Sequence, residues 1–401
     1  MCRSIRATPS SLPSGGSEQL SAPPLRILQV LRAPVGGLFR HVYDLTEELA
    51  KRGHQVGVVA DSLTSDDLTG QRLRALAPSI ALGTYYFPMP RTVGLGDVTT
   101  PFAVRSLANK LKIDVLHGHG AKGGVHARLS RIGRSDRVAL NTPHGGVLNY
   151  KPGTAVGNMF RSIEHAIGRI TDAYIFESSY AQRRFHELIG KPPCAEAVIH
   201  NGLAPEEFDP LPCDADARDF VFVGEFREAK GISYLIDALV DVKARDGRPA
   251  TMAMAGSGPE FEQTKARIAR LGLSERIELL GIRPVRQALN RGHCLVVASL
   301  AESLPYVILE GASAGRPVVS TNVGGIAEIF GPTSGSLFPP ADTGALRAAM
   351  QKFMDDPEAG RAEARVRLDY IRPRFSISHM VDQIEALYRE VLGKRRGMPT
   401  G

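Results

Sequence analysis

The chain has 401 residues, of which 43% are hydrophobic and 23% charged, and its formal net charge is +7. This length exceeds that of one ordinary domain, so two domains are expected, and the composition fits a soluble globular protein. No apolar run approaches the roughly 18–20 residues that a membrane-spanning helix needs. The four cysteines lack the spacing of a metal site, which favours a reducing compartment and hence a cytoplasmic protein.

The positive charge is concentrated in the first half. Residues 1–205 carry a net charge of +9, and the remainder carries −2. No recognition motif or aromatic platform accompanies it, so we expect no nucleic-acid partner. We expect this half to lie peripherally on the anionic cytoplasmic face of the inner membrane, where each basic residue contributes about 1 kcal/mol. The basic residues are Arg128, Arg131, Arg134 and Arg137, which recur every three positions, and Lys110, Lys112, Arg183 and Arg184.

The chain begins with residues 1–24, which are rich in Ser, Pro and Gly and lack the apolar core of a secretory signal; we predict a disordered lead. A βαβ pattern follows, with a buried strand at 26–31, a turn at Gly36-Gly37, a helix at 38–49 and a second strand at 55–60. The glycines do not form G-x-G-x-x-G, so they favour close backbone approach by a ligand over a dinucleotide site.

Polar side chains stand where several predicted strands of the first half end. His117 and Glu177 each close or follow such a strand, His144 lies in a loop after another, and His119 belongs to a glycine-rich turn. Because ligands bind beyond the carboxyl edge of an open α/β sheet, we expect a site there. The predicted strands are 114–117, 137–142 and 173–176.

An acidic segment with prolines and no periodicity, residues 205–219, is predicted to link this half to a second βα series. In that series Arg227 and Lys230 stand between a strand and the start of a helix. Cations are disfavoured there by the helix dipole, which favours a functional explanation. Two cations at a strand end can stabilise the negative charge of a departing diphosphate.

The densest pattern runs from 298 to 328, ASLAESLPYVILEGASAGRPVVSTNVGGIAE. It predicts a strand at 294–298, a loop with Glu302, and a helix that starts at Pro305 and contains Glu310. The helix N-terminus suits a phosphate, whereas two carboxylates suit the hydroxyls of a sugar nucleotide.

The E-x7-E spacing is followed by a G-x-P-V-V strand and by V-G-G-I-x-E. Together these motifs resemble the donor-site signature of glycosyltransferase family 4, whose members are retaining enzymes of the GT-B fold. The resemblance covers roughly residues 25–392. It implies an α/β protein with two Rossmann-like domains facing a central cleft. These are an acceptor domain at 25–205 and a donor domain at 206–375, with a C-terminal helix and basic tail at 376–401 that cross back to the first domain.

The resemblance also implies roles for individual residues. The expected catalytic residues are His144, Glu302, Lys230 and Arg227, with His144 and Glu302 on sugar hydroxyls and the two cations on the diphosphate. The family has an arginine where this chain has Glu225, so the role passes to Arg227. The residues expected to bind the donor are Gly36, Gly37, Gly256, Gly258, Ile282, Arg283, Ser303, Leu304, Pro305, Tyr306 and Glu310, the last on the ribose hydroxyls.

The implied reaction moves a hexose from a UDP- or GDP-sugar to a saccharide or lipid-linked acceptor with retention, in cell-surface polysaccharide or lipopolysaccharide assembly. The first half offers no strong carboxylate nucleophile for a double displacement. The resemblance implies that the acceptor attacks on the face from which the leaving group departs. No Asp-x-Asp motif ends a strand, so no obligatory metal or other cofactor is expected. Two alternatives remain: an epimerase or hydrolase of sugar nucleotides, and a non-catalytic nucleotide-sugar-binding protein.

Overall fold

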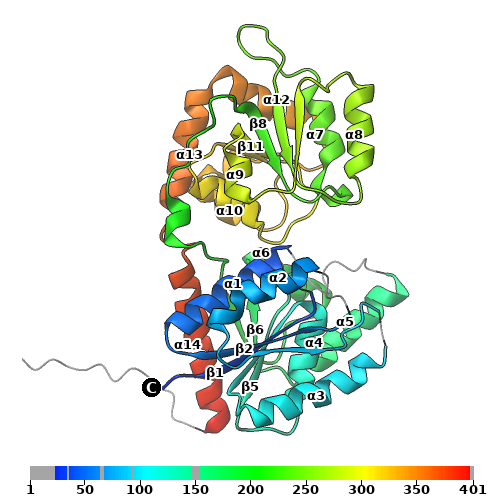
Figure 1. Cartoon of the computed structure of the whole chain (residues 1–401), viewed down its shortest axis with the longest axis vertical. Coiled ribbons are helices and arrows are strands. Elements are labelled where there is room, and N and C mark those ends of the chain that lie inside the picture. Colours follow the sequence, from blue (N-terminus) through cyan, green and yellow to red (C-terminus); the bar gives the residue numbers. More distant parts are fainter. Residues whose placement is uncertain (1–22, 34–35, 64–66, 93, 146–152, 398–401) are drawn as a thin grey trace, which may run out of the picture.

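The computed structural model describes residues 23–33, 36–63, 67–92, 94–145 and 153–397. The predicted disordered lead at 1–24 therefore lies outside the described residues except for its last two, and so do the final four residues of the basic tail. The described chain forms two α/β units, each built on one parallel sheet (Figure 1). None of the helices in these ranges is long and apolar enough to span a bilayer.

The first unit has a seven-stranded sheet in the order β3-β2-β1-β4-β5-β6-β7. Its strands read as apolar runs because helices cover both faces, as is usual for parallel sheets. The strands are β1 (Arg26–Leu31), β2 (Gln55–Asp61), β3 (Thr84–Phe87), β4 (Val115–His119), β5 (Val138–Thr142), β6 (Ala173–Phe176) and β7 (Ala195–Val198). The helices are α1 (Gly36–Lys51), α2 (Asp67–Leu76), α3 (Gly96–Lys110), α4 (Gly120–Arg131), α5 (Ala155–Gly168) and α6 (Ser179–Leu188).

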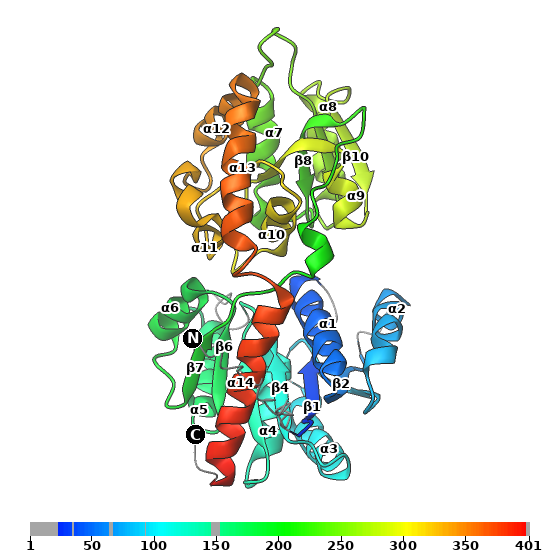
Figure 2. The same cartoon turned by 90° about the vertical axis from the view of Figure 1, so that its left-hand side faces the viewer.

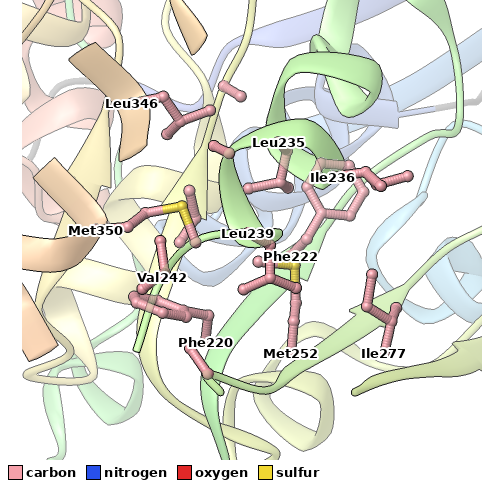
Figure 3. Close-up of a cluster of buried hydrophobic side chains, with 14 of the residues drawn as sticks. Phe220, Phe222, Leu235, Ile236, Leu239, Val242, Met252, Ile277, Leu346 and Met350 are labelled. Atoms are coloured by element: carbon pink, nitrogen blue, oxygen red, sulfur yellow. The ribbon is translucent and has the colours of Figure 1, made fainter. Parts of the chain in front are cut away.

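The second unit has a five-stranded sheet in the order β10-β9-β8-β11-β12. Side chains from β8, β9, α7 and α12 fill one face of this sheet (Figure 3), among them Phe222, Leu235, Met252 and Met350. The strands are β8 (Arg218–Val223), β9 (Met252–Ala255), β10 (Ile277–Gly281), β11 (Gly292–Val297) and β12 (Val318–Ser320). The helices are α7 (Ile232–Leu239), α8 (Phe261–Arg270), α9 (Val285–Leu289), α10 (Tyr306–Ser313), α11 (Ile326–Phe330), α12 (Thr343–Asp355) and α13 (Pro357–Ile371).

The last helix, α14 (Ile377–Arg396), returns from the second unit to the first and runs along it (Figure 2). Its buried residues join a core with β1 and β5, in which Tyr388 is fully buried. Burying one apolar face of a helix of this length contributes far more than its intrinsic propensity does. The predicted α/β fold with two Rossmann-like units is confirmed, and we propose that the domain limits lie near 205 and 375.

The glycine-rich segment after residue 117 has a structural cause. The glycine-rich turn predicted around His119 is wrong, because β4 extends to His119 and α4 begins at the next residue. A Cβ on Gly123 would lie 2.2 Å from the Val30 carbonyl oxygen, and one on Gly118 would lie 2.5 Å from the Cα of Gly124. These glycines therefore let α4 pack closely against the sheet.

The predicted exposed row of arginines is also wrong. Arg128 is fully buried and its guanidinium donates to both carboxylate oxygens of Glu164, at 2.6 and 2.9 Å. Arg131 is buried and pairs with Asp172 at 3.1 Å. Of the four, only Arg134 keeps a partly exposed side chain. A buried charge needs a partner, so most of this row serves the interior of the first unit.

Candidate functional site

The loop before α10 brings the E-x7-E segment to the face that the first unit covers. Pro305 occupies the N-cap position of α10. The V-G-G segment holds this loop, because the Gly325 N–H donates to the Ser303 carbonyl at 2.7 Å. A Cβ on Gly324 would lie 2.0 Å from the Glu302 carbonyl oxygen, and Gly324 has a φ of 63°, which glycine adopts without strain. The glycines of the motif thus position the loop.

Lys230 and Glu302 meet across this loop. The Lys230 Nζ donates to the Glu302 Oε1 at 2.5 Å, and the Ser299 hydroxyl donates to the same oxygen at 2.7 Å. Both charged side chains are mostly buried. Gly231 allows this approach, since a Cβ there would lie 2.0 Å from the Ala298 carbonyl oxygen. A cation and a carboxylate, 72 positions apart in sequence, are therefore paired at the loop that leads into α10.

Arg227 does not join this pair. Its guanidinium makes an ion pair with Glu225 at 3.0 Å, and 46% of its side chain is exposed. Glu225, which occupies the position of the expected arginine, thus pairs with Arg227 at the surface.

Four other predicted donor residues lie at the ends of β9 and β10. Gly256 and Gly258 serve the backbone of their own unit, because Cβ atoms there would lie 1.8 Å from the Gly224 carbonyl oxygen and 2.5 Å from the Phe226 carbonyl oxygen. The other two are Ile282, which is 78% exposed, and Arg283, which is exposed and donates to the Leu280 carbonyl at 3.1 Å.

Glu310 faces an arginine of the first unit. Arg40 on α1 donates to Glu310 at 3.1 Å, to Asp44 at 2.5 Å and to Glu207 at 2.5 Å. Its guanidinium also lies 5.4 Å from the centre of the Tyr306 ring. Arg40, which the sequence interpretation missed, therefore connects α1, the segment between the units and α10.

Burial governs the protonation of this cluster. It raises the pKa of Glu310 to about 7, with Arg40 opposing the shift and the carboxylates of Glu207 and Asp44 adding to it. It also raises the pKa of Asp44 to about 6. Although burial disfavours the charge of Arg40, the neighbouring carboxylates hold its pKa above the ordinary value, so it stays protonated.

Two further predicted residues, Gly37 and Leu304, lie where the units touch, and Gly36 precedes the first of them. A Cβ on Gly37 would lie 3.3 Å from the Tyr306 ring, so this glycine lets α1 approach the donor-site helix. The Leu304 carbonyl accepts a hydrogen bond from Asn201 at 3.5 Å. Gly36 has a φ of 60° with open space beside it, and it begins α1 in a conformation that glycine favours.

His144 belongs to a group of histidine rings at the carboxyl edge of the first sheet. It follows β5 with a φ of 48°, which is unusual for a side chain with a Cβ. Its Nε2 lies 3.1 Å from the Nδ1 of His119, whose Nε2 lies 2.7 Å from the Gln29 Oε1. The ring of His41 on α1 lies 4.9 Å from that of His144, centre to centre. Burial holds the pKa of His144 well below its ordinary value, so the ring is neutral.

Glu177, which the sequence places at the expected site without assigning it a role, contacts the loop before α10. Its Oε1 accepts from the Ser303 hydroxyl at 2.6 Å, and the Gly145 backbone N–H also donates to it. The side chain is buried, and its Oε2 has no hydrogen-bond partner among the described residues. Burial raises the pKa of this carboxyl group. A buried carboxylate oxygen without a partner among the described residues thus lies between the histidine group and the loop before α10.

The glutamate that ends the V-G-G-I-x-E motif also connects the units. Both carboxylate oxygens of Glu328 accept backbone N–H groups at the start of α6, from Ser179 and Tyr180, at 2.9 Å. Its Oε2 also lies 3.0 Å from the His200 Nε2. An anion at a helix N-terminus is favourable, so this motif residue stabilises the contact between the units.

Both halves of the chain are similar to known proteins. Residues 204–370 match the family model "Glycosyl transferases group 1", and residues 35–207 match "Glycosyltransferase Family 4". The chain is 27% identical over 361 residues to a glycogen synthase of Mycobacterium tuberculosis, covering 82% of this chain and 85% of that one. It is 24% identical to the gpi3 subunit of a phosphatidylinositol N-acetylglucosaminyltransferase of Schizosaccharomyces pombe, covering 89% and 78%.

Solved structures share the fold. A sucrose-phosphate synthase from Thermosynechococcus elongatus superposes with a TM-score of 0.76 at 19% identity, covering 93% of this chain and 100% of that one. WaaG, a glycosyltransferase involved in lipopolysaccharide biosynthesis, superposes with a TM-score of 0.67 at 16% identity, covering 92% and 100%.

Proposed function

We propose that this chain, which belongs to the family 4-like glycosyltransferases with the GT-B fold, transfers a hexose from a UDP- or GDP-sugar to a saccharide or lipid-linked acceptor with retention of configuration. The observation that carries the proposal is the contact between Lys230 and Glu302 directly before α10. A diphosphate at this helix N-terminus lies beside the lysine, and the hexose beyond it lies beside the glutamate.

The remaining roles follow from position. Glu310 lies one helical turn into α10. There its carboxylate can accept hydrogen bonds from both ribose hydroxyls, which replace the hydrogen bond from Arg40. Glu177 and His144 approach from the first unit, and each offers an acceptor atom for a hydroxyl of the hexose or of the acceptor. We assign Arg227 only an outer role, because its partner is Glu225.

The names of two similar proteins support our proposal for the acceptor. One acts on phosphatidylinositol and another in lipopolysaccharide biosynthesis, as their names state. We therefore propose an acceptor in cell-surface polysaccharide or lipopolysaccharide assembly, and an enzyme that works at the cytoplasmic face of the inner membrane.

The deciding experiment is a donor panel. Thermal unfolding is measured with UDP- and GDP-hexoses, since a bound donor raises the midpoint by mass action. The stabilising donor is then incubated with and without lipid and saccharide extracts, and the product is analysed by NMR. We expect sugar transfer only with acceptor, and an α-linked product from an α-linked donor. Release or epimerisation of the sugar without acceptor would instead favour a hydrolase or an epimerase. Stabilisation by the donor without any turnover would favour a non-catalytic binding protein.

We propose that exposed apolar side chains near the start of α3, and not the row of arginines, attach the protein to the membrane. Leu95, Val98 and Phe102 at the start of α3 are 87%, 64% and 69% exposed, and their spacing places them on one helix face. Arg91, four positions before, is also exposed. An apolar stripe beside a basic residue suits insertion at an anionic lipid surface.

We expect the protein to float with anionic liposomes at low salt and to float less at high salt, where exposed charges are screened. Replacing Leu95, Val98 and Phe102 by serine should abolish flotation. Val366→Ser is the matched control, because this residue is 49% exposed but lies on α13 of the other unit. Equal failure of the wild-type protein to float with anionic and neutral liposomes would favour a soluble acceptor.

A further inference from the structure

Three imidazole rings from three different elements converge in the first unit. His41 lies on α1, His119 ends β4, and His144 follows β5. Each offers one ring nitrogen, and these three atoms lie within 4.8 Å of one another. His41 and His119 are buried, whereas His144 is partly exposed, so the group opens on the side of His144.

The hydrogen bonds around the rings set their tautomers. The His41 Nδ1 lies 3.0 Å from the Asn201 Oδ1, and the His119 Nε2 lies 2.7 Å from the Gln29 Oε1. Amide oxygens only accept, so both ring nitrogens carry the proton and donate. The lone pairs of His41 Nε2 and His119 Nδ1 therefore point into the group. His41 Nε2 has no hydrogen-bond partner among the described residues.

This arrangement is the one that metal-binding histidines adopt. A ligating ring usually donates its other N–H to an oxygen that fixes its orientation, as Asn201 and Gln29 do here. The nearby His117 does not compete, because its two nitrogens contact Tyr388 at 2.6 Å and Thr142 at 2.8 Å.

We propose that His41, His119 and His144 bind one divalent transition-metal ion, with zinc the best match, and leave its fourth position open on the side of His144. Zinc–nitrogen bonds of about 2.0–2.1 Å place tetrahedral ligand atoms about 3.3 Å apart. The His119 Nδ1 and the His144 Nε2 already lie 3.1 Å apart, close to this spacing. The ring of His41 therefore moves inward when the ion binds. The His144 proton shifts from Nε2 to Nδ1, and no net charge is lost from the ring.

The metal has an inhibitory effect on transfer, a consequence that rests on the proposed function. Once His144 ligates the ion through Nε2, its Nδ1 carries the proton and can no longer accept a hydrogen bond from a hydroxyl of the hexose or the acceptor. The binding itself does not depend on that function, and it is measured without substrates.

The test uses untagged, metal-free wild-type protein titrated with Co²⁺, which reports tetrahedral coordination by a visible absorption band, and with Zn²⁺ in calorimetry. We expect one ion per chain, displacement of cobalt by zinc, and loss of the band in His41→Gln and His144→Gln. Asn201→Ala should weaken binding by about 10–100-fold, because it removes the orienting oxygen. His379→Ala, which removes an exposed histidine of α14, is the matched control and should bind as the wild type does.

Two results would overturn the site: no visible band in the wild type, or wild-type binding in the His41 and His144 variants. If those variants do not fold, X-ray absorption spectroscopy of the zinc-loaded wild type provides the test. The proposal requires three imidazole ligands around the zinc ion, and a smaller number would refute it. Zinc binding without inhibition of transfer would leave the metal site standing and contradict only the role of His144 in the reaction.

Discussion

Replacing Lys230 by alanine is expected to lower kcat for sugar transfer by about 10²–10³-fold while changing donor affinity much less. Negative charge develops on the diphosphate as the glycosidic bond breaks, so a fixed cation stabilises the transition state more than the ground state. Lys230 is suited to this because it is mostly buried and held by Glu302 at 2.5 Å. The measurement is kcat and KM from initial rates, with donor binding followed separately by calorimetry.

Two variants of the same unit serve as controls. Arg227→Ala should reduce kcat far less, because this side chain is about half exposed and paired with Glu225. Lys265→Ala removes an exposed lysine of α8 and should leave both constants unchanged. A wild-type kcat in Lys230→Ala would show that another group stabilises the leaving diphosphate.

The elements around the donor site were predictable because their signals are local. The apolar run 294–298 corresponds to β11, and the helix predicted from Pro305 corresponds to α10. A buried strand or an amphipathic helix leaves its pattern within ten or so neighbouring residues. The order of the strands and the fold class follow from repeated βα units, which admit few arrangements.

Pairings between distant residues were not predictable. The spacing of Arg128 and Arg131 predicts an exposed charged face, but their partners Glu164 and Asp172 lie some 36 and 41 positions further on. Whether an arginine lies inside depends on such a partner, and a charge count contains no information about it. Arg40 is a second example, since its contact with Glu310 joins positions 270 apart.

Glycine patterns were similarly ambiguous from sequence alone. The close approaches at Gly256 and Gly258 are to backbone of the same unit, whereas Gly37 approaches a side chain of the other unit. All three were expected to face a ligand. A glycine signals that something comes near, and only the structure shows whether that neighbour is a strand, a helix or an open space.

Replacing Glu310 by glutamine should keep the fold and weaken donor binding by about ten- to hundredfold. In the proposed donor complex the carboxylate accepts hydrogen bonds from both ribose hydroxyls, and loss of a charged hydrogen-bond partner costs about 1.5–3 kcal/mol. The isosteric amide fills the same buried position, so a thermal unfolding midpoint near that of the wild type confirms that the fold is intact. Wild-type donor affinity in this variant, measured by calorimetry, would remove Glu310 from the ribose site.

The pH dependence of donor binding tests the same carboxylate in a second way. Burial raises the pKa of Glu310 to about 7, so in the free protein it is mostly protonated at pH 6 and mostly ionised at pH 8. Because only the ionised form accepts hydrogen bonds from both hydroxyls, donor affinity should rise by about tenfold over this range.

The groups that face Glu310 are Arg40, which stays charged, and the carboxylates of Glu207 and Asp44. Asp44 titrates near pH 6, so Asp44→Asn separates its contribution. In Glu310→Gln the rise should disappear, and its persistence there would assign the titration to another group.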